Sequence, residues 1–178
     1  MTALKGRSGI HVVDSVKATT IIDMNVVLAP FVPPGRFIEA LDTLHLDGSD
    51  DWKEWKDADI IFAHQEFRGC RMGAIASEHG DVWKRDFPMV VSGHIHSNQR
   101  LQENVYYPGS AMQVSYGENS SKKTVSLIIH APDDFEEIDL LLRRKKIVYT
   151  TIKDVPDIDA TPNCDVKVCV DSTKEEFK

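Results

Sequence analysis

Short apolar runs bounded by turn residues recur along the whole sequence, and they constrain the fold more than any other feature. Runs of this length favour strands, because most helices need about ten or more residues. Two runs, at 59–63 and 87–92, are apolar throughout, which is typical of strands that are buried on both faces. The remaining runs lie at 10–14, 19–31, 105–107, 124–130, 137–142, 146–152 and 165–170. The sequence therefore predicts a sheet-rich chain of the α/β or α+β class.

Helical patterns are few. Residues 36–44 carry apolar side chains at helical spacing directly after Pro34 and predict a helix. Residues 72–79 are expected to form a second short helix that ends at Gly80. Residues 171–176 are typical of a helix N-cap followed by a first turn.

Turn residues suggest how some of the strands pair. The run at 19–31 is interrupted by polar residues and predicts a hairpin or two strands. The run at 146–152 is expected to pair with the run at 137–142 through a basic turn at 143–145. Residues 80–86 are interpreted as a turn.

Composition limits the partners of the chain. It has 178 residues, with 21 Lys and Arg against 28 Asp and Glu, for a net charge of −7. An acidic balance disfavours a free-standing cationic nucleic-acid binder, so DNA as a substrate would need something other than net charge to hold it.

Targeting signals are not apparent in the sequence. No apolar run approaches the roughly 20 residues of a membrane span, and the first ten residues lack the apolar core of a secretory signal. Three cysteines without zinc-like spacing favour free thiols in a reducing compartment. We therefore expect a cytoplasmic protein without a membrane partner.

Histidines follow the two fully apolar runs. His64 comes directly after the first run, and Gly93, His94 and His96 come directly after the second. In open α/β sheets, ligands bind beyond the carboxyl ends of the strands, so these side chains are expected to meet there. Neutral imidazole is a good ligand for transition metals. The glycine allows a sharp backbone turn next to an ion. The pattern predicts a metal site formed by His64, His94 and His96.

The same residues carry a family resemblance. Ala63-His64, then Gly93-His94-Ile95-His96, then Tyr107-Pro108-Gly109-Ser110 resemble the calcineurin-like metallophosphoesterase superfamily. Within it, residues 90–118 look most like the nuclease subunit of SbcCD-type DNA repair complexes, in the form of the phage recombination endonuclease subunits. The resemblance covers roughly residues 9–171.

This resemblance implies a fold and a cofactor. The fold would be a partial sandwich of two β-sheets flanked by helices, and the complete site would hold two divalent ions, most simply manganese. His64 and His94 would bind the second ion, and His96 the first. Side chains that flank the histidines are candidates to support the ligands or to contact phosphate: Ser92, Asn98 and Tyr107.

The chain also departs from the family pattern. The motifs Asp-x-His, Gly-Asp-x-x-Asp and Gly-Asn-His-(Asp/Glu), which supply the bridging carboxylate, an Asn ligand and the catalytic His, are missing from the sequence. We therefore expect no catalytic residue on this chain and at most one weakly bound metal. Residues 1–155 are interpreted as the C-terminal half of the catalytic domain. Residues 156–178 are interpreted as a linker and the start of a truncated capping-type domain.

The functional hypothesis follows from the resemblance. The chain is expected to be a fragment or subunit of a metal-dependent DNA exonuclease or endonuclease of recombination or break repair, inactive alone. Its expected partners are DNA, the missing N-terminal half or a partner chain, an SbcC-like ATPase, and a second copy in the complete enzyme. Two alternatives remain: a phosphomonoesterase or small-nucleotide phosphodiesterase, and a non-catalytic scaffold. For a phage or viral protein, the compartment would be the host cytoplasm.

Overall fold

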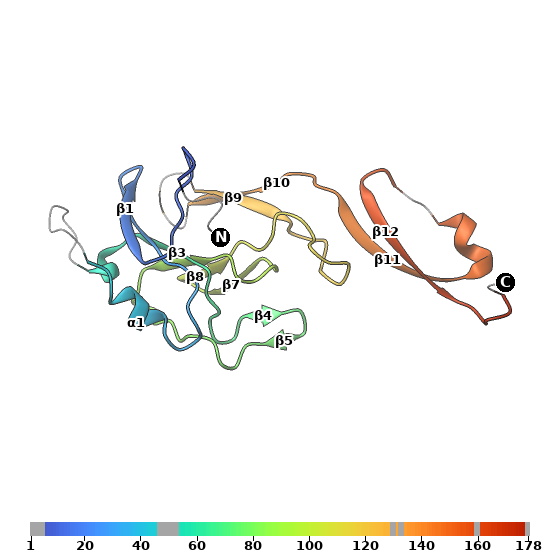
Figure 1. The fold of residues 1–178 in the computed structure, drawn as a ribbon, viewed down its shortest axis with the longest axis horizontal. Coiled ribbons are helices and arrows are strands. Elements are labelled where there is room, and N and C mark those ends of the chain that lie inside the picture. Colours follow the sequence, from blue (N-terminus) through green and yellow to red (C-terminus); the bar gives the residue numbers. More distant parts are fainter. Residues whose placement is uncertain (1–5, 46–53, 129–130, 132–133, 159–160, 177–178) are drawn as a thin grey trace.

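The computed structural model describes residues 6–45, 54–128, 131, 134–158 and 161–176. A mixed six-stranded sheet lies in the larger body on the left of Figure 1. Its strands are β1 (Lys17–Ile21), β2 (Met24–Leu28), β3 (Ile60–Ala63), β6 (Met89–Ser92), β7 (Gln99–Gln102) and β8 (Val105–Tyr107). Their order across the sheet is β1-β2-β3-β6-β8-β7. Strands β2, β3, β6 and β8 run parallel, and β1 and β7 add antiparallel edges. The chain is thus of mixed α/β class with few helices, consistent with a partial α+β sandwich.

The hairpin predicted within 19–31 is confirmed. Strands β1 and β2 are antiparallel and are joined by Ile22 and Asp23. Both residues have positive φ, at 48° and 62°, as in the two-residue turns that match the twist of paired strands.

One face of the sheet is covered by aromatic side chains. Helix α1 (Phe37–Leu41) confirms the helix predicted at 36–44, although it is shorter. The 3-10 helix η2 (Trp55–Asp57) contributes the buried Trp55 to this aromatic layer. The Trp83 ring lies 5.5 Å from that of Phe37 and 5.6 Å from that of Trp55, measured between centroids. The Trp55 indole donates a hydrogen bond to Asp42 at 2.7 Å, so its buried N–H is satisfied.

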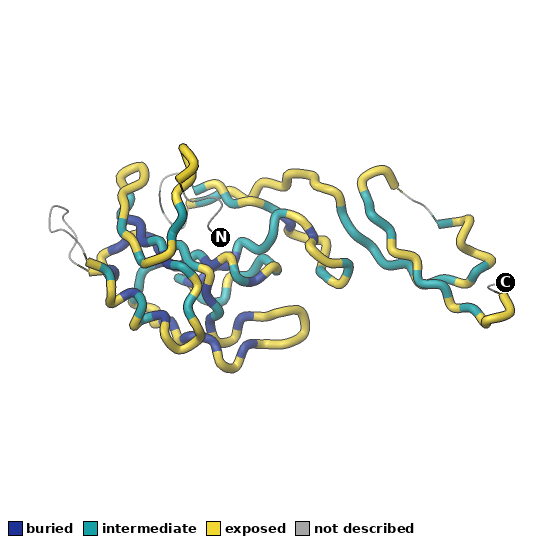
Figure 2. The backbone as a smooth tube through the Cα atoms, in the orientation of Figure 1, coloured by how far each residue is buried: buried dark blue, intermediate teal, exposed yellow. Residues whose placement is uncertain are grey.

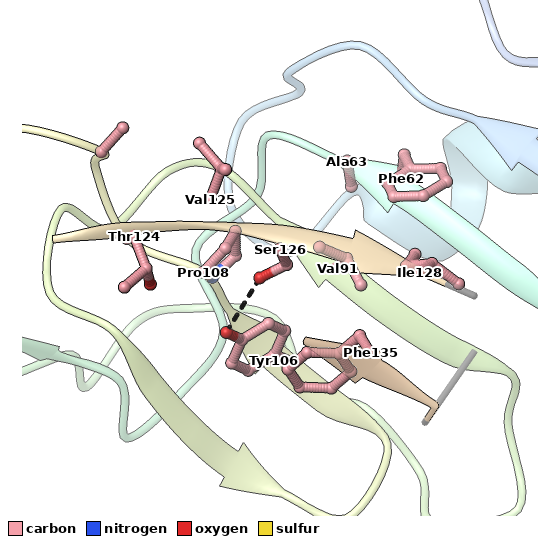
Figure 3. Close-up of a pocket in the computed structure, with 13 residues that line it drawn as sticks. Phe62, Ala63, Val91, Tyr106, Pro108, Thr124, Val125, Ser126, Ile128 and Phe135 are labelled. Atoms are coloured by element: carbon pink, nitrogen blue, oxygen red, sulfur yellow. Dashed lines mark hydrogen bonds between the residues drawn. The ribbon is translucent and has the colours of Figure 1, made fainter. Parts of the chain in front are cut away.

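The other face packs against a hairpin of β9 (Thr124–Ile128) and β10 (Phe135–Asp139). Ile128 and Phe135 join the apolar cluster on this face, and Phe135 stacks on Tyr106 with ring centroids 4.8 Å apart. An apolar pocket of about 410 Å³ remains between the hairpin and the sheet (Figure 3). The Tyr106 hydroxyl lies 3.2 Å from Ser126 Oγ at the edge of this pocket.

A parallel ribbon forms the C-terminal part of the chain. Strands β11 (Arg144–Thr151) and β12 (Cys164–Asp171) pair residue for residue, and the 3-10 helix η3 (Ile152–Asp157) lies in their connection (Figure 1). The ribbon is largely exposed or half-buried, whereas the buried residues concentrate around the central sheet (Figure 2).

The expected pairing of 146–152 with 137–142 is therefore wrong. Strand β10 already pairs with β9, and β11 pairs with β12. Arg144 belongs to a strand, and its guanidinium bonds Asp139, while that of Arg143 bonds Asp165 at 2.9 Å. These ion pairs engage two of the three basic residues that the sequence assigns to a turn, and Lys145 donates to the Val114 carbonyl instead.

The helix expected at 72–79 is also wrong. Short strands β4 (Arg71–Met72) and β5 (Ile75–Ala76) form a hairpin there instead. Gly73 has a φ of +65°, which turns the chain. Met72 and Ile75 are exposed, so their apolar spacing does not mark a buried helical face.

Residues 80–81 do not form a simple turn, because their backbone runs beside residues 66–68 and is hydrogen-bonded to it. We call these two paired stretches the seam. Asp81 N–H donates to Glu66 O at 2.8 Å, and Arg68 N–H donates to Asp81 O at 2.9 Å. The buried Asp81 carboxylate accepts hydrogen bonds from Gln65 Nε2 at 2.6 Å and from Phe37 N–H at 3.2 Å. Asp81 therefore ties the segment after β3 to the start of α1.

Other sequence features agree with the structure. Thr173 and Glu176 exchange side-chain to backbone hydrogen bonds, as in a capping box, but residues 174–176 form a turn, so a helix there stays a prediction. All three cysteines are free. Among the described residues, none of the helices has the length and apolar character needed to cross a bilayer.

The close seam at Gly80 generates a stability prediction. A Cβ atom there would lie 2.5 Å from Phe67 C and 2.6 Å from Arg68 N, both backbone atoms. Gly80→Ala is therefore expected to lower the free energy of unfolding by about 2–3 kcal/mol, measured by urea denaturation. Gly117→Ala is the matched control, because no heavy atom lies within 4 Å of its Cβ position. Equal stability of the two variants would contradict the tight seam.

Candidate metal centre

The parallel pairing of β3 and β6 brings two of the predicted histidines together. His64 follows β3, and His94 follows β6 after Gly93. Gly93 N–H donates to Ala63 O at 3.0 Å, which aligns the two strand ends. The two imidazole rings lie 5.0 Å apart between centroids, at an interplanar angle of 87°.

The surroundings of this pair suit a metal ion. His94 Nδ1 is buried and has no hydrogen-bond partner, and His94 Nε2 lies 3.9 Å from Glu66 Oε2. Burial, reinforced by the neighbouring imidazoles, lowers the pKa of His64 and favours the neutral form that binds metals. Neutral imidazole nitrogens are good ligands for divalent transition metals, so His64 and His94 are two candidate donors.

The third predicted histidine is held differently. His96 Nδ1 lies 3.1 Å from Glu118 Oε1. Among the residues that the structure describes, no group of three or more His, Cys, Asp or Glu side chains is arranged to hold a metal. The expectation that all three imidazoles converge on one point is therefore not met, and metal binding by His96 stays a prediction.

Glu118 belongs to a charged cluster that the sequence did not reveal. Its Oε2 accepts hydrogen bonds from Lys123 Nζ at 3.0 Å and from Val114 N–H at 3.1 Å. Burial acts to raise the pKa of Glu118, but the hydrogen bonds from Lys123, His96 and Val114 outweigh it and lower that pKa to about 2. Glu118 is therefore ionised at neutral pH.

Lys123 holds the loop that carries His96 in place through several hydrogen bonds. Its ammonium is almost fully buried and also donates to His96 O at 3.0 Å and to Ser110 Oγ at 2.9 Å. The Pro-Gly-Ser turn adds a bond from Ser110 N–H to the same His96 carbonyl at 3.1 Å. Gly109 has a φ of +78°, and a Cβ there would lie 2.7 Å from Asn98 N, so only glycine permits this approach.

Two of the predicted flanking residues support the backbone after His64. Ser92 Oγ donates to Gln65 O at 2.7 Å and accepts from Gln65 N–H at 2.8 Å. Tyr107 donates to Gln65 O at 3.1 Å and accepts from Phe67 N–H at 2.8 Å. Burial raises the pKa of Tyr107, so the hydroxyl keeps its proton. Both side chains are fully buried, which favours support of the ligands over contact with phosphate.

The third flanking residue, Asn98, connects the loop to the β9–β10 hairpin. Its amide nitrogen donates to the Tyr106 hydroxyl at 2.9 Å and to the Glu137 carboxylate. Those bonds occupy the amide donors of Asn98, so a phosphate contact there stays a prediction that needs the amide to rearrange.

Space for a ligand lies beside His94 and His96. A pocket of about 260 Å³ is lined by both histidines together with Met72, Gly73, Ile95, Ser97 and Glu118. The larger apolar pocket in Figure 3 has no charged side chain in its lining. Groups able to hold ions or move protons therefore gather at the smaller pocket.

The Glu118–Lys123 pair generates a second stability prediction. Glu118→Gln leaves the buried Lys123 ammonium without its counter-charge and is expected to cost about 3 kcal/mol at neutral pH. The folded pKa of Glu118 lies below the ordinary value of 4.5, so this stabilisation is present above that pH and is lost as the pH falls toward 2. Urea unfolding at several pH values measures both effects. The exposed Glu103→Gln is the control, and an equal, pH-independent loss in both variants would contradict the pairing.

Known proteins resemble this chain over much of its length. No family model matches it. It is 47% identical over 156 residues to "Putative phosphoesterase 078R" of Invertebrate iridescent virus 3, covering 86% of this chain and 43% of that protein. It is 37% identical over 186 residues to "Putative phosphoesterase 244L" of Invertebrate iridescent virus 6, covering 100% of this chain and 64% of that protein. The chain thus spans about half the length of these relatives, and their names support a phosphoesterase family for it.

Proposed function

We propose that this chain contributes the histidine ligands of a metal-dependent phosphodiesterase that cleaves DNA in recombination or break repair. The observation that carries the proposal is the His64–His94 pair, with its unpartnered Nδ1 atom, in a chain similar to two proteins named as phosphoesterases. Since both relatives are viral, the proposed setting is the cytoplasm of an infected host cell.

Residues of this chain have separable roles in that proposal. His64 and His94 would hold one ion between their rings. A bound divalent ion such as Mn²⁺ supplies a Lewis acid for the phosphoryl oxygens. Ser92 and Tyr107 fix the backbone after His64, so that the imidazole keeps its orientation.

A second ion needs more than the described residues offer. Imidazoles are neutral ligands and offset none of the charge of two divalent ions, and Glu118 is already engaged with Lys123. We propose that the bridging carboxylate of a two-metal site comes from further polypeptide, either in a longer chain or in a partner. The chain alone is then expected to bind one ion and to show no turnover.

The choice of a nuclease over a phosphomonoesterase rests on the Tyr-Pro-Gly-Ser element and the strands that follow it. Ser110 of that element donates a backbone hydrogen bond to the His96 carbonyl. An ATPase partner and a homodimer of the complete enzyme belong to the same proposal. A scaffold without catalysis would have no use for a buried, unpartnered imidazole nitrogen beside a second imidazole.

Metal titration tests the ligand assignment. The full chain is expected to bind one Mn²⁺, followed by electron paramagnetic resonance of the free ion. His64→Ala and His94→Ala should each weaken binding at least tenfold, because each removes a direct donor. His79→Ala is the matched control, since His79 is exposed and lies outside the pair. Equal binding by all variants would overturn the site.

A turnover assay tests the proposal that part of the active site comes from further polypeptide. With Mn²⁺ and single-stranded or duplex DNA, the chain alone is expected to release no nucleotides above background. Robust hydrolysis that His94→Ala abolishes would contradict the proposal that further carboxylates are required.

A further inference from the structure

The His96 imidazole is bonded at one ring nitrogen and open to solvent on its other side. Its Nδ1 lies 3.1 Å from Glu118 Oε1. Even so, 52% of the His96 side chain is exposed, against 17% of that of Glu118. Because the two nitrogens lie on different sides of the ring, the exposed side is the one that carries Nε2. The ring borders the pocket of about 260 Å³, so the protonation of Nε2 decides what His96 can offer there.

The contacts of Lys123 show that Glu118 is a carboxylate. The Lys123 side chain is 3% exposed. Its Nζ donates to Glu118 Oε2, His96 O and Ser110 Oγ. These three bonds use every proton of an ammonium group, so Lys123 is charged. A buried ammonium needs a counter-charge, and Glu118 is the acidic group that is bonded to it.

An ionised Glu118 fixes the tautomer of His96. Its Oε2 already accepts from Lys123 Nζ and from Val114 N–H, and a carboxylate has no proton to donate. The bond between Glu118 Oε1 and His96 therefore needs a proton on Nδ1. A neutral imidazole carries one ring proton, so its Nε2 is left as an electron-pair donor.

The backbones of both partners are anchored. The buried Gln113 donates from Nε2 to Glu118 O at 2.9 Å. The His96 carbonyl accepts from Lys123 Nζ and from Ser110 N–H. These bonds keep the Glu118 carboxylate beside Nδ1, and a carboxylate bonded to one ring nitrogen sets both the orientation and the tautomer of an imidazole.

We propose that Glu118 is a positioning residue that holds His96 in the Nδ1–H tautomer and presents Nε2 to the pocket as an electron-pair donor. The use of this arrangement in catalysis rests on the proposed phosphodiesterase function. In this state Nε2 accepts a hydrogen bond from a water molecule or a hydroxyl group, but it cannot donate one to a phosphate oxygen. The inference thus adds the class of group that His96 contacts.

Long-range ¹H–¹⁵N correlation spectra of the full chain, labelled with ¹⁵N-histidine, test the inference. They are recorded without metal or DNA at alkaline pH, where imidazole is neutral, and His96→Gln identifies the His96 signals. Nδ1 of His96 is expected to have the chemical shift of a protonated ring nitrogen, and Nε2 that of an unprotonated one. The exposed His79 is the internal reference for an imidazole in solvent.

Glu118→Gln is expected to invert the tautomer. Lys123 Nζ and Val114 N–H both need the amide oxygen, so the amide NH₂ group faces His96 Nδ1 and can only donate to it. The ring proton must then lie on Nε2, and the two chemical shifts exchange. Glu103→Gln, at an exposed carboxylate, is the matched control and should keep the tautomer of the unmodified chain.

A proton on Nε2 in the unmodified chain, or a tautomer mixture like that of His79, overturns the inference whether or not the variant folds. A folded Glu118→Gln chain in which His96 keeps its Nδ1 proton overturns it as well, because Glu118 then does not set the tautomer. Since these spectra need neither metal nor DNA, a failed metal titration or turnover assay would overturn the proposed function and leave the tautomer result unchanged.

Discussion

The candidate site depends on the backbone of Gln65, which two buried hydroxyls hold in place. Ser92 at the end of β6 and Tyr107 at the end of β8 both donate to the Gln65 carbonyl. The Gln65 side chain bonds the buried Asp81 carboxylate in turn. A buried polar network of this kind is stable only when every member is paired, so it fixes one arrangement of the strand ends. His64 takes its position from this network.

That rigidity divides the histidines into two environments. His64 and His94 lie side by side with an open nitrogen, whereas His96 is bonded to Glu118 and its carbonyl is tied to Lys123. Ligand sites are formed by donors that folding leaves available, and His94 Nδ1 meets this condition. Under the proposed function, the histidine pair would hold one ion, and a second would need donors from further polypeptide.

The sequence predicted what local patterns determine. Apolar runs marked β3 and β6, and their parallel order placed His64 beside His94. Local patterns did not predict the strand pairing that depends on segments far apart in sequence. Strand β11 pairs with β12, although η3 lies between them in the sequence. Residues 72–79 have ambiguous apolar spacing, and their hairpin is set by Gly73. Lys123 carried no signal, because its partners Ser110 and His96 meet it only in the fold.

The most direct test of the account is a crystal structure of the full chain grown with Mn²⁺ and measured at a wavelength where manganese scatters anomalously. One strong anomalous peak between His64 and His94, within coordinating distance of His94 Nδ1, is the predicted result. With the chain alone, no peak of comparable strength should lie at His96. A peak bound by other residues, or no peak at saturating Mn²⁺ with both imidazoles ordered, would contradict the proposal that this histidine pair is a metal centre.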